Sequence, residues 1–571
     1  MKSSKFEWIP NEVLLEVFEY LSPADIFQGF YYLNKRYNEF LISLQLQMDL
    51  IDLSKRTYDY YNYFLFSLMS QRIISLRCED IFDRLIYQIR LSDFISLKYL
   101  TIYNLQYVTL QKMIPQLNNL QNLLYLNLQT RIDSTMEDKI IFQGQLPLIQ
   151  TCILNLNKQI SFENQHPYSH LTYLTINQCS IEDICLFVHF YTPQLQYLTV
   201  TLINGKIPTL TNDICHLKSL VIHTSTVSFP NLQKSVLNSF SSLQRLTIYA
   251  TDIDYANGKT WEVFISKYLR HLIQFRLHVI FPDDILPTVD ERSQLLQTFN
   301  ISYFRSRTWF FALHPCTTQR TIELFSIPMI NDDIQYNLYN TNIEETTTTN
   351  DRNIFGNVKK LSLILTNSDE NLPLEKVKFS NVEQIKLISY FREYQSFPKS
   401  LLVDISHVVR FSNLKSIEFL GEHFPTSSLV LFDYTPNLHS LSIRLNNFIK
   451  MTKMLTDQDV CRCLTKLIKH LTITSINNVK DLLLYERLPM VFVHLDSLSL
   501  SIVNLDDLYL MITLLLFKMA QILKIMNIHI DAHYNTQNLD QFMGWLIYYM
   551  YQRDLSYVDV KLSDNHLSFC F

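Results

Sequence analysis

Glycine is scarce in this sequence. Only seven glycines occur among its 571 residues, and no two of them stand close together. Phosphate-binding loops need several glycines within a few residues, because the backbone must approach the phosphate closely. The Gly-x-Ser-x-Gly turn of many hydrolases needs a close pair of glycines as well. The scarcity therefore excludes the glycine-rich nucleotide-binding motifs and this hydrolase motif.

Strong net charge and long apolar runs are also missing. The formal net charge of −5 provides no basic field for nucleic acid and no polybasic patch for a membrane. The most membrane-like stretch, 508–517, is too short to cross a bilayer, and Glu7, Pro10 and Glu12 interrupt any signal peptide. The nine cysteines lack the regular spacing of a disulfide framework. We therefore expect a cytoplasmic or nuclear protein that binds neither nucleic acid nor membrane.

What the sequence does contain is a repeated pattern. From about residue 70, three apolar residues recur with two and then one variable residue between them, most clearly in LTYLTINQCSI at 171–181. This pattern resembles the leucine-rich repeat, including Cys179 where asparagine is usual, and copies at 97 and 123 or 195 and 217 are 26 and 22 residues apart. Copies begin at Leu97, Leu123, Leu171, Leu195, Leu217, Leu243, Leu272, Val358, Val382, Leu414, Leu438, Ile468 and Leu495, and weaker ones at Ile73, Ile149, Leu523 and Leu555.

The resemblance implies an α/β fold. Each copy predicts a short strand with alternate residues pointing inward, followed by a return segment, and such units stack to share one core. We expect a curved leucine-rich-repeat solenoid with a parallel inner sheet, whose first edge strand is 50–54 and whose first return helix is 58–72. The pattern fails at 297–357, where TNIEETTTTNDRN predicts an exposed insertion between two solenoid halves.

Three helices are predicted before the repeats. The first, at 11–20, carries a narrow polar stripe of Glu12, Glu16 and Glu19, and its apolar surface is wide enough for two contacts. Ser22, with proline next to it, is a good start for the second helix. YYLNKRYNEFL forms the third. Something besides the helices themselves is expected to cover the second apolar surface.

This N-terminal segment resembles the F-box, a module of about 40 residues. The matching residues are Ile9-Pro10, Glu12-Val13-Leu14-Leu15, Tyr20-Leu21-Ser22 and Asp25-Ile26, whereas Tyr37 stands where the family usually has tryptophan. The resemblance implies docking on a Skp-type adaptor, and through it on a cullin scaffold. The predicted adaptor-binding residues are Ile9, Pro10, Leu14, Val17, Phe18, Leu21 and Ile26.

A column of tyrosines is the predicted substrate-binding surface. Tyr99, Tyr125, Tyr173 and Tyr197 precede the second apolar residue of their copies, with Thr151 between them. Neighbouring strands lie about 4.8 Å apart, so these rings should form a ladder on the concave face. Further predicted binding residues are Tyr249, Arg245 and Arg276. Tyrosine and arginine suit a partly acidic polypeptide; in the alternative, the tyrosines only stack on one another.

Two groups of residues are candidates for chemistry. His529, Asp531 and His533 alternate along a strand, as metal ligands or as an ordinary exposed strand face. Cys461 and Cys463 lack the spacing of a zinc or redox pair, which predicts buried structural thiols. No nucleophile with a base and an orienting acid can be assembled. We therefore expect no catalytic residue, no metal and no cofactor.

Taken whole, the chain resembles an F-box/leucine-rich-repeat protein. The predicted domains are 1–45 (F-box), 46–296 (first solenoid part), 297–357 (irregular repeats with the Thr-rich insertion) and 358–571 (second solenoid part). The resemblance implies a non-catalytic substrate-recognition subunit of a cullin-type ubiquitin ligase that binds a protein substrate. The alternatives are a leucine-rich-repeat scaffold unrelated to ubiquitin transfer, and a hydrolase within the insertion.

Overall fold

The computed structural model of the chain divides into two compact units. The first comprises Met1–Tyr255 and Val263–Phe275, and the second Ala256–Glu262 and Arg276–Phe571. The structure describes residues 9–51, 60–79, 90–105, 107–130, 140–142, 146–155, 160–162, 170–203, 216–235, 237, 240–285, 288–316, 320–330, 333–337, 345–346, 354–365, 378–389, 405–406, 408–421, 430–476, 482–502, 506–519, 522–530, 536–553, 555, 558–563 and 566–570.

Three short helices open the first unit, as predicted. They are α1 (Asn11–Phe18), α2 (Pro23–Phe30) and α3 (Lys35–Ser43). The Ser22 hydroxyl accepts a hydrogen bond from the backbone N–H of Asp25, and Asn34 caps α3 in the same way. Leu14, Phe27, Tyr37 and Leu41 fill the centre of the three helices, each at most 1% exposed.

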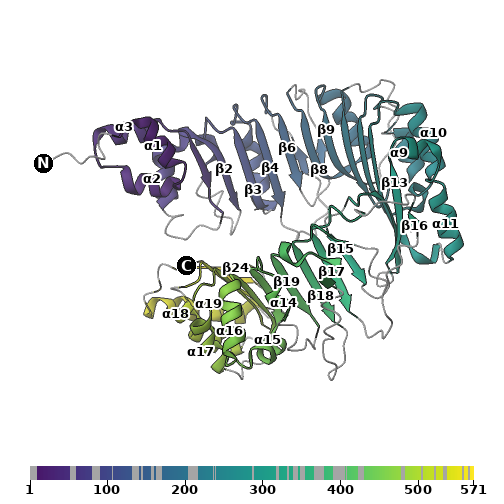
Figure 1. Cartoon of the computed structure of the whole chain (residues 1–571). Coiled ribbons are helices and arrows are strands. Elements are labelled where there is room, and N and C mark those ends of the chain that lie inside the picture. Colours follow the sequence, from purple (N-terminus) through teal and green to yellow (C-terminus); the bar gives the residue numbers. More distant parts are fainter. Residues whose placement is uncertain are drawn as a thin grey trace. The chain divides into compact units, whose positions relative to one another are not determined.

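A parallel sheet makes up most of the first unit. Its strands follow the order β1-β2-β3-β4-β6-β8-β9-β10-β11, and these neighbouring strands pair in parallel. Figure 1 shows them side by side. They are β1 (Leu46–Asp49), β2 (Ile73–Glu79), β3 (Tyr99–Leu105), β4 (Tyr125–Thr130), β6 (Thr151–Asn155), β8 (Tyr173–Ser180), β9 (Tyr197–Ile203), β10 (Ser219–Thr224) and β11 (Arg245–Ala250). The predicted α/β class is confirmed.

Alternate residues of each strand enter the core. In β10, Leu220 and Ile222 are fully buried, whereas Ser219 and Val221 between them are partly exposed. The apolar pattern thus marks the buried face, because side chains of a strand alternate between its two faces. The predicted edge strand at 50–54 is wrong by four residues, since β1 ends at Asp49. The predicted return helix is present as η2 (Tyr61–Leu65), α5 (Phe66–Met69) and η3 (Ser70–Arg72).

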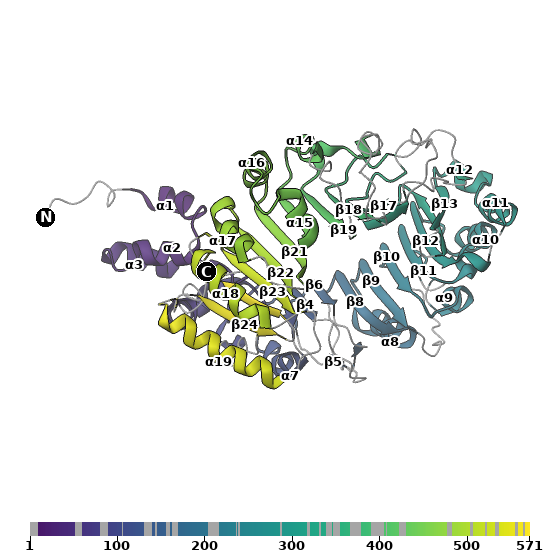
Figure 2. The ribbon, with the colours of Figure 1, turned by 90° about the horizontal axis from the view of Figure 1, so that it is seen from below.

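Helical segments lie between many of the strands. In the first unit these include η4 (Leu91–Asp93), α7 (Tyr107–Leu117), α8 (Ile181–Leu186), η5 (Phe187–Tyr191), α9 (Phe229–Ser235), η7 (Ile253–Tyr255) and the second half of α10 (Gly258–Tyr268). Figure 2 shows α8 beside β8. The short strands β5 (Ile140–Phe142) and β7 (Ile160–Phe162) pair with each other.

Antiparallel strands open the second unit, most of them within the interval 297–357 where the repeated pattern fails. β12 (Gln274–Pro282), β14 (Thr321–Ile327), β13 (Phe310–Cys316) and β16 (Glu345–Thr346) pair antiparallel in that order. β13 and β14 form a hairpin that includes no copy of the repeated pattern. The first part of the interval 297–357 therefore contains a regular antiparallel hairpin, β13 and β14. Most of the Thr-rich segment 341–353 lies outside the described residues.

A second parallel sheet follows. Its order is β15-β17-β18-β19-β20-β21-β22-β23-β25-β24. The strands are β15 (Asp333–Asn337), β17 (Lys360–Leu365), β18 (Gln384–Ser389), β19 (Ser416–Leu420), β20 (Ser440–Arg444), β21 (His470–Ile476), β22 (Ser497–Ile502), β23 (Ile525–Ile530), β24 (Asp559–Ser563) and β25 (His566–Cys570). The last two pair antiparallel, so the weak copy expected at Leu555 does not continue the parallel order.

Helices connect these strands as well. They are η8 (Asp283–Ile285), α11 (Val289–Gln297), α12 (Ser302–Ser306), η10 (Phe411–Asn413), α14 (Val430–Asp433), α15 (Leu445–Thr452), α16 (Gln458–Leu467), α17 (Leu482–Val491), α18 (Asp506–Met519) and α19 (Thr536–Gln552). α15 packs beside β20 and β21 (Figure 2). Among the described residues, none of the helices has the length and hydrophobicity that spanning a membrane requires.

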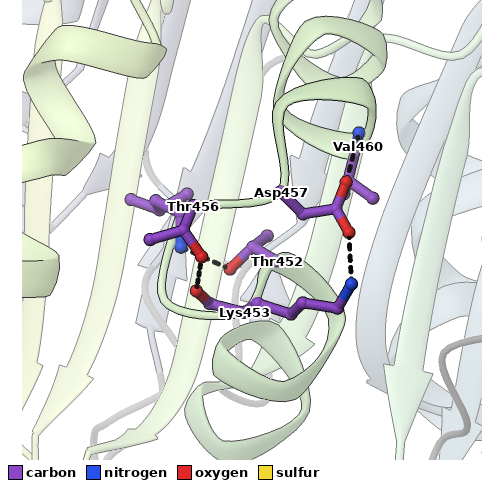
Figure 3. A network of polar contacts seen from close by, with 6 residues as sticks. Thr452, Lys453, Thr456, Asp457 and Val460 are labelled. Atoms are coloured by element: carbon purple, nitrogen blue, oxygen red, sulfur yellow. Dashed lines mark hydrogen bonds and ion pairs between the residues drawn. The ribbon is translucent and has the colours of Figure 1, made fainter.

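The connection from α15 to α16 is a left-handed turn without glycine. Lys453, Met454 and Leu455 have φ angles of 49°, 60° and 59°, a conformation that costs a non-glycine residue about 1–2 kcal/mol. Figure 3 shows the bracing contacts: Lys453 Nζ lies 2.9 Å from the Asp457 carboxylate, which also accepts from the Val460 N–H. The Thr452 hydroxyl accepts from the Leu455 N–H. These contacts hold the turn in its conformation.

Candidate binding surfaces

The first candidate surface lies on α1 and the turn after it. Val13, Leu15 and Val17 are 42–44% exposed, Leu21 is 36% exposed and Tyr20 is 88% exposed. These five exposed apolar residues are called here the α1 surface; Val13 and Val17 are four residues apart and share one side of α1, whereas Leu15 lies on another side of the helix. Exposed apolar side chains gathered in this way mark interaction sites in soluble proteins.

The structure corrects part of the predicted adaptor-binding set. Leu14, Phe18 and Ile26 are at most 6% exposed and belong to the core of the three helices. Phe18 packs edge-on against Phe30, with ring centroids 4.9 Å apart. Leu14 and Phe18 are four residues apart and face inward together, so Val13 and Val17 face outward together. That spacing is the signal that sequence reasoning missed for Val13; it gives no signal for Leu15, on another side of α1, or for Tyr20, which follows the helix.

The remaining predicted residues lie at the two ends of α1, with Ile9 and Pro10 before it and Val17 and Leu21 at or after its end. Pro10, Val17 and Leu21 are exposed and Ile9 is partly buried. The Arg36 guanidinium donates to the Ile9 carbonyl at 2.6 Å and to the Asn11 side chain at 2.7 Å. α3 thereby fixes the chain that leads into α1.

The three helices contact the helical segment η2, which follows β1. The Ala24 N–H donates to the Tyr61 hydroxyl at 3.2 Å, and the Tyr61 ring is 2% exposed. Desolvation by burial raises the pKa of Tyr61, so the hydroxyl stays neutral. Tyr31 packs on Phe64 with ring centroids 5.7 Å apart. The α1 surface is therefore held in a fixed position within the first unit.

The second candidate surface is the predicted tyrosine column. Tyr99 pairs with Tyr125, Tyr125 with Thr151, Thr151 with Tyr173 and Tyr173 with Tyr197. The ring centroids of Tyr99 and Tyr125 are 6.4 Å apart, and those of Tyr173 and Tyr197 are 6.1 Å apart. Tyr99, Tyr173 and Tyr197 are 37–45% exposed, and Tyr125 is partly buried. The predicted geometry is confirmed.

The surface around this column is aromatic and mostly uncharged. The rings of His223 and Tyr249 stack with centroids 4.2 Å apart, and Arg77 lies over Tyr103 at 5.3 Å. The Thr201 hydroxyl donates to the Asn177 amide oxygen at 3.1 Å. The column continues through Ser219 to the exposed Arg245, whereas the partly buried Arg276 belongs to the second unit.

The equivalent column of the second unit has a different composition. Its residues, in register, are Asp333, Lys360, Gln384, Ser416, Ser440, His470, Ser497 and Ile525. No tyrosine occurs in this column. In the neighbouring column Lys386 and Glu418 form an ion pair at 3.3 Å. The two faces therefore differ in chemistry although their strands pair alike.

The chemical candidates do not assemble a reactive centre among the described residues. Asp531 and His533 lie outside that part of the chain, and no group of three metal-binding side chains is found within it; His529 is in β23. Cys461 is buried and Cys463 half-buried in α16, and desolvation raises the pKa of both thiols. The prediction of buried thiols is confirmed for Cys461, whereas Cys463 is more exposed than predicted. Cys179 is fully buried.

The sequence matches none of the protein-family models, and no curated protein sequence matches it.

Proposed function

We propose that this chain is a non-catalytic substrate-recognition subunit of a cullin-type ubiquitin ligase. In this proposal α1 to α3 are an F-box, and the α1 surface binds a Skp-type adaptor. The two parallel sheets with their connecting helices are a leucine-rich-repeat solenoid, and the tyrosine column contacts a protein substrate. Catalysis belongs to the partners, and this chain contributes proximity and orientation.

The observation that carries the proposal is the α1 surface and its position in the chain. Five apolar residues are exposed on α1 and the turn after it, while Leu14 and Phe18 of the same helix fill a core. The three-helix segment that carries them precedes a sheet with exposed tyrosines. Each apolar side chain covered by a partner contributes about 1.5–3 kcal/mol before the costs of association are subtracted. A patch of this kind has enough apolar area to anchor a partner.

Affinity purification from eukaryotic cell lysate tests the adaptor contact. The test variant is Val13→Asp with Val17→Asp, which places two charges on the α1 surface without touching the core. The control is Gln28→Asp with Gln47→Asp, which adds the same charge at exposed polar sites of the first unit. We expect the wild type and the control to retain adaptor and cullin, and the test variant to lose both while its thermal unfolding is unchanged.

Two results would overturn parts of the proposal. Full adaptor recovery by the test variant would contradict the assignment of the α1 surface. Absence of adaptor and cullin from the wild-type sample would contradict the ligase function and favour the scaffold alternative.

The substrate surface is tested in the same purification. Replacing Tyr125, Tyr173 and Tyr197 by alanine should remove the captured substrate candidates and leave adaptor recovery unchanged, because aromatic side chains dominate binding surfaces. The matched control replaces Ser416, Ser440 and Ser497, which hold the equivalent positions of the second unit, by alanine. Unaltered capture by the tyrosine variant would place the substrate site elsewhere.

A further inference from the structure

A row of ionisable side chains crosses the second sheet just before its strands begin. Each member's backbone N–H donates to the carbonyl of the member before it, at 2.7–3.0 Å. In order, the members are Lys359, Glu383, Lys415, His439, Lys469, Asp496 and Lys524. These seven residues, called here the edge row, come from seven successive strands of the second unit, β17 to β23.

Charges alternate along the edge row except at one step. The Lys415 ammonium lies 2.9 Å from the Glu383 carboxylate, and Lys524 lies 2.8 Å from Asp496. Hydrogen bonds from these lysines lower the pKa of Glu383 and of Asp496. Neighbouring strands are about 4.8 Å apart, so an acid at one step can neutralise the lysines on both sides. His439 stands where the alternation would place a third acid.

The surroundings of His439 are basic. Its ring lies 5.7 Å from that of His470, and its neighbours in the row are Lys415 and Lys469. Burial, followed by His470 and the two lysines, lowers the pKa of His439, so its ring is neutral at pH 7. Its Nδ1 atom is buried without a hydrogen-bond partner. Lys469 is exposed; its charge helps to lower the pKa of Asp496, but among the described residues the ion pair of Asp496 is made with Lys524.

A polar cavity of about 550 Å³ lies along the neighbouring part of the row, at Lys359, Glu383 and Lys415, and ends at Lys415 beside His439. It is lined by Gly356, Asn357, Lys359, Asn381, Glu383, Ser412, Asn413, Lys415 and Asn437. Each of the four asparagines donates its side-chain N–H to a carbonyl of the preceding connection, at 2.6–2.9 Å. These bonds fix the amide groups and leave the cavity with a hydrophilic wall. A polar chain can pass there without burying unpaired groups.

We propose that the edge row binds one oxyanion at His439, between Lys415 and Lys469, and that this oxyanion is a phosphate or carboxylate group on a polypeptide. The ligand group supplies the negative charge that Glu383 and Asp496 supply at the other steps. The anion site follows from the row itself, and only its assignment to the substrate rests on the proposed function. The adjoining cavity receives the polar chain that carries the group.

Thermal unfolding of the full-length protein in inorganic phosphate, compared with chloride at equal ionic strength, tests the site. A ligand that binds the folded state raises its unfolding temperature. His439→Glu places a carboxylate at the His439 position of the row, and Lys469→Gln removes an exposed cation. We expect each substitution to weaken phosphate binding about tenfold, which is about 1.4 kcal/mol. The matched control is Lys524→Gln, which removes a lysine already paired with Asp496 and should leave phosphate binding unchanged.

Equal phosphate stabilisation of the wild type, His439→Glu and Lys469→Gln would overturn the site. Binding of three peptides of one Asn- and Ser-rich sequence, with phosphoserine, glutamate or serine at the centre, identifies the source of the anion. We expect the phosphoserine or the glutamate peptide to bind more tightly than the serine peptide, and equal binding of all three also overturns the site. Adaptor recovery is a separate readout for the wild type and His439→Glu. Absence of the adaptor from both samples contradicts the ligase function but does not contradict the anion site.

Discussion

The outer faces of the two parallel sheets differ far more than their interiors. In the first unit the column in register holds four tyrosines, whereas the equivalent column of the second unit holds lysine, glutamine, serine and histidine. Both interiors are filled by leucine, isoleucine, valine and similar residues. The buried strand residues therefore specify the parallel sheet. The solvent-facing strand residues are free to differ between the units and so to determine what each face binds.

The edge before the strands shows the same contrast. In the first unit the corresponding residues are Lys98, Leu124, Gln150, Thr172, Gln196, Lys218 and Gln244, which include no acid. Lys218 donates to the Gln196 amide at 3.0 Å instead of pairing with a carboxylate. The parallel sheet of the first unit therefore forms without an alternating row of charges. The alternating charges of the second unit are not needed to form a sheet of this kind, which is consistent with a role in binding.

A charge introduced into the buried interior of either sheet should cause the largest loss of stability. The loss should be similar in the two units, because their interiors are alike. Leu220 and Leu471 are at most 1% exposed, so Leu220→Asp and Leu471→Asp each bury an unpaired carboxylate and should cost about 4 kcal/mol or more. Thermal unfolding followed by circular dichroism measures the loss. Ser219→Asp and Thr472→Asp, on the outer faces, should unfold like the wild type; equal losses for inner and outer positions would contradict the alternation.

Removing one asparagine from the second unit should have a medium effect. The Asn413 side chain donates to the Ser380 carbonyl at 2.9 Å, so Asn413→Ala should cost about 1 kcal/mol. Hydrogen exchange should become faster around that connection. The control is Gln194→Ala, at the equivalent exposed position of the first unit, where we expect no change. If both variants behave alike, the asparagines do not stabilise the second unit.

Neutralising one acid of the edge row should have the smallest effect. The hydrogen bond from Lys524 lowers the pKa of Asp496, so the carboxylate stabilises the fold at neutral pH and loses this contribution as the pH falls below its ordinary pKa of about 4. Asp496→Asn should therefore lower stability by at most about 1 kcal/mol at pH 7. Unfolding curves should show the difference becoming smaller as the pH falls from about 4 through the lowered pKa of Asp496, and also in 1 M salt, because protonation and screening both weaken the attraction. A difference that stays unchanged under both conditions would assign another role to Asp496.

The tyrosine column could be predicted from the sequence because strand periodicity is a local property. One residue before the second apolar position is always on the outer face, so Tyr99 and Tyr125 come into register once the strands pair in parallel. The direction of α1 was harder to predict, because its apolar residues surround most of the helix. Packing of Phe18 against Phe30 decided which side faces inward and so which residues form the α1 surface.

The sequence by itself determined the repeating strands, their buried residues and the outer tyrosines, since spacing and alternation act within about 25 residues. Only the tertiary structure decided the antiparallel hairpin of β13 and β14, the left-handed turn at Lys453, and the edge row that collects charges from Lys359 to Lys524. Each of these depends on contacts between connections or strands. A turn without glycine adopts φ > 0 only where surrounding hydrogen bonds compensate its strain, and charges distant in sequence meet only when their strands stack.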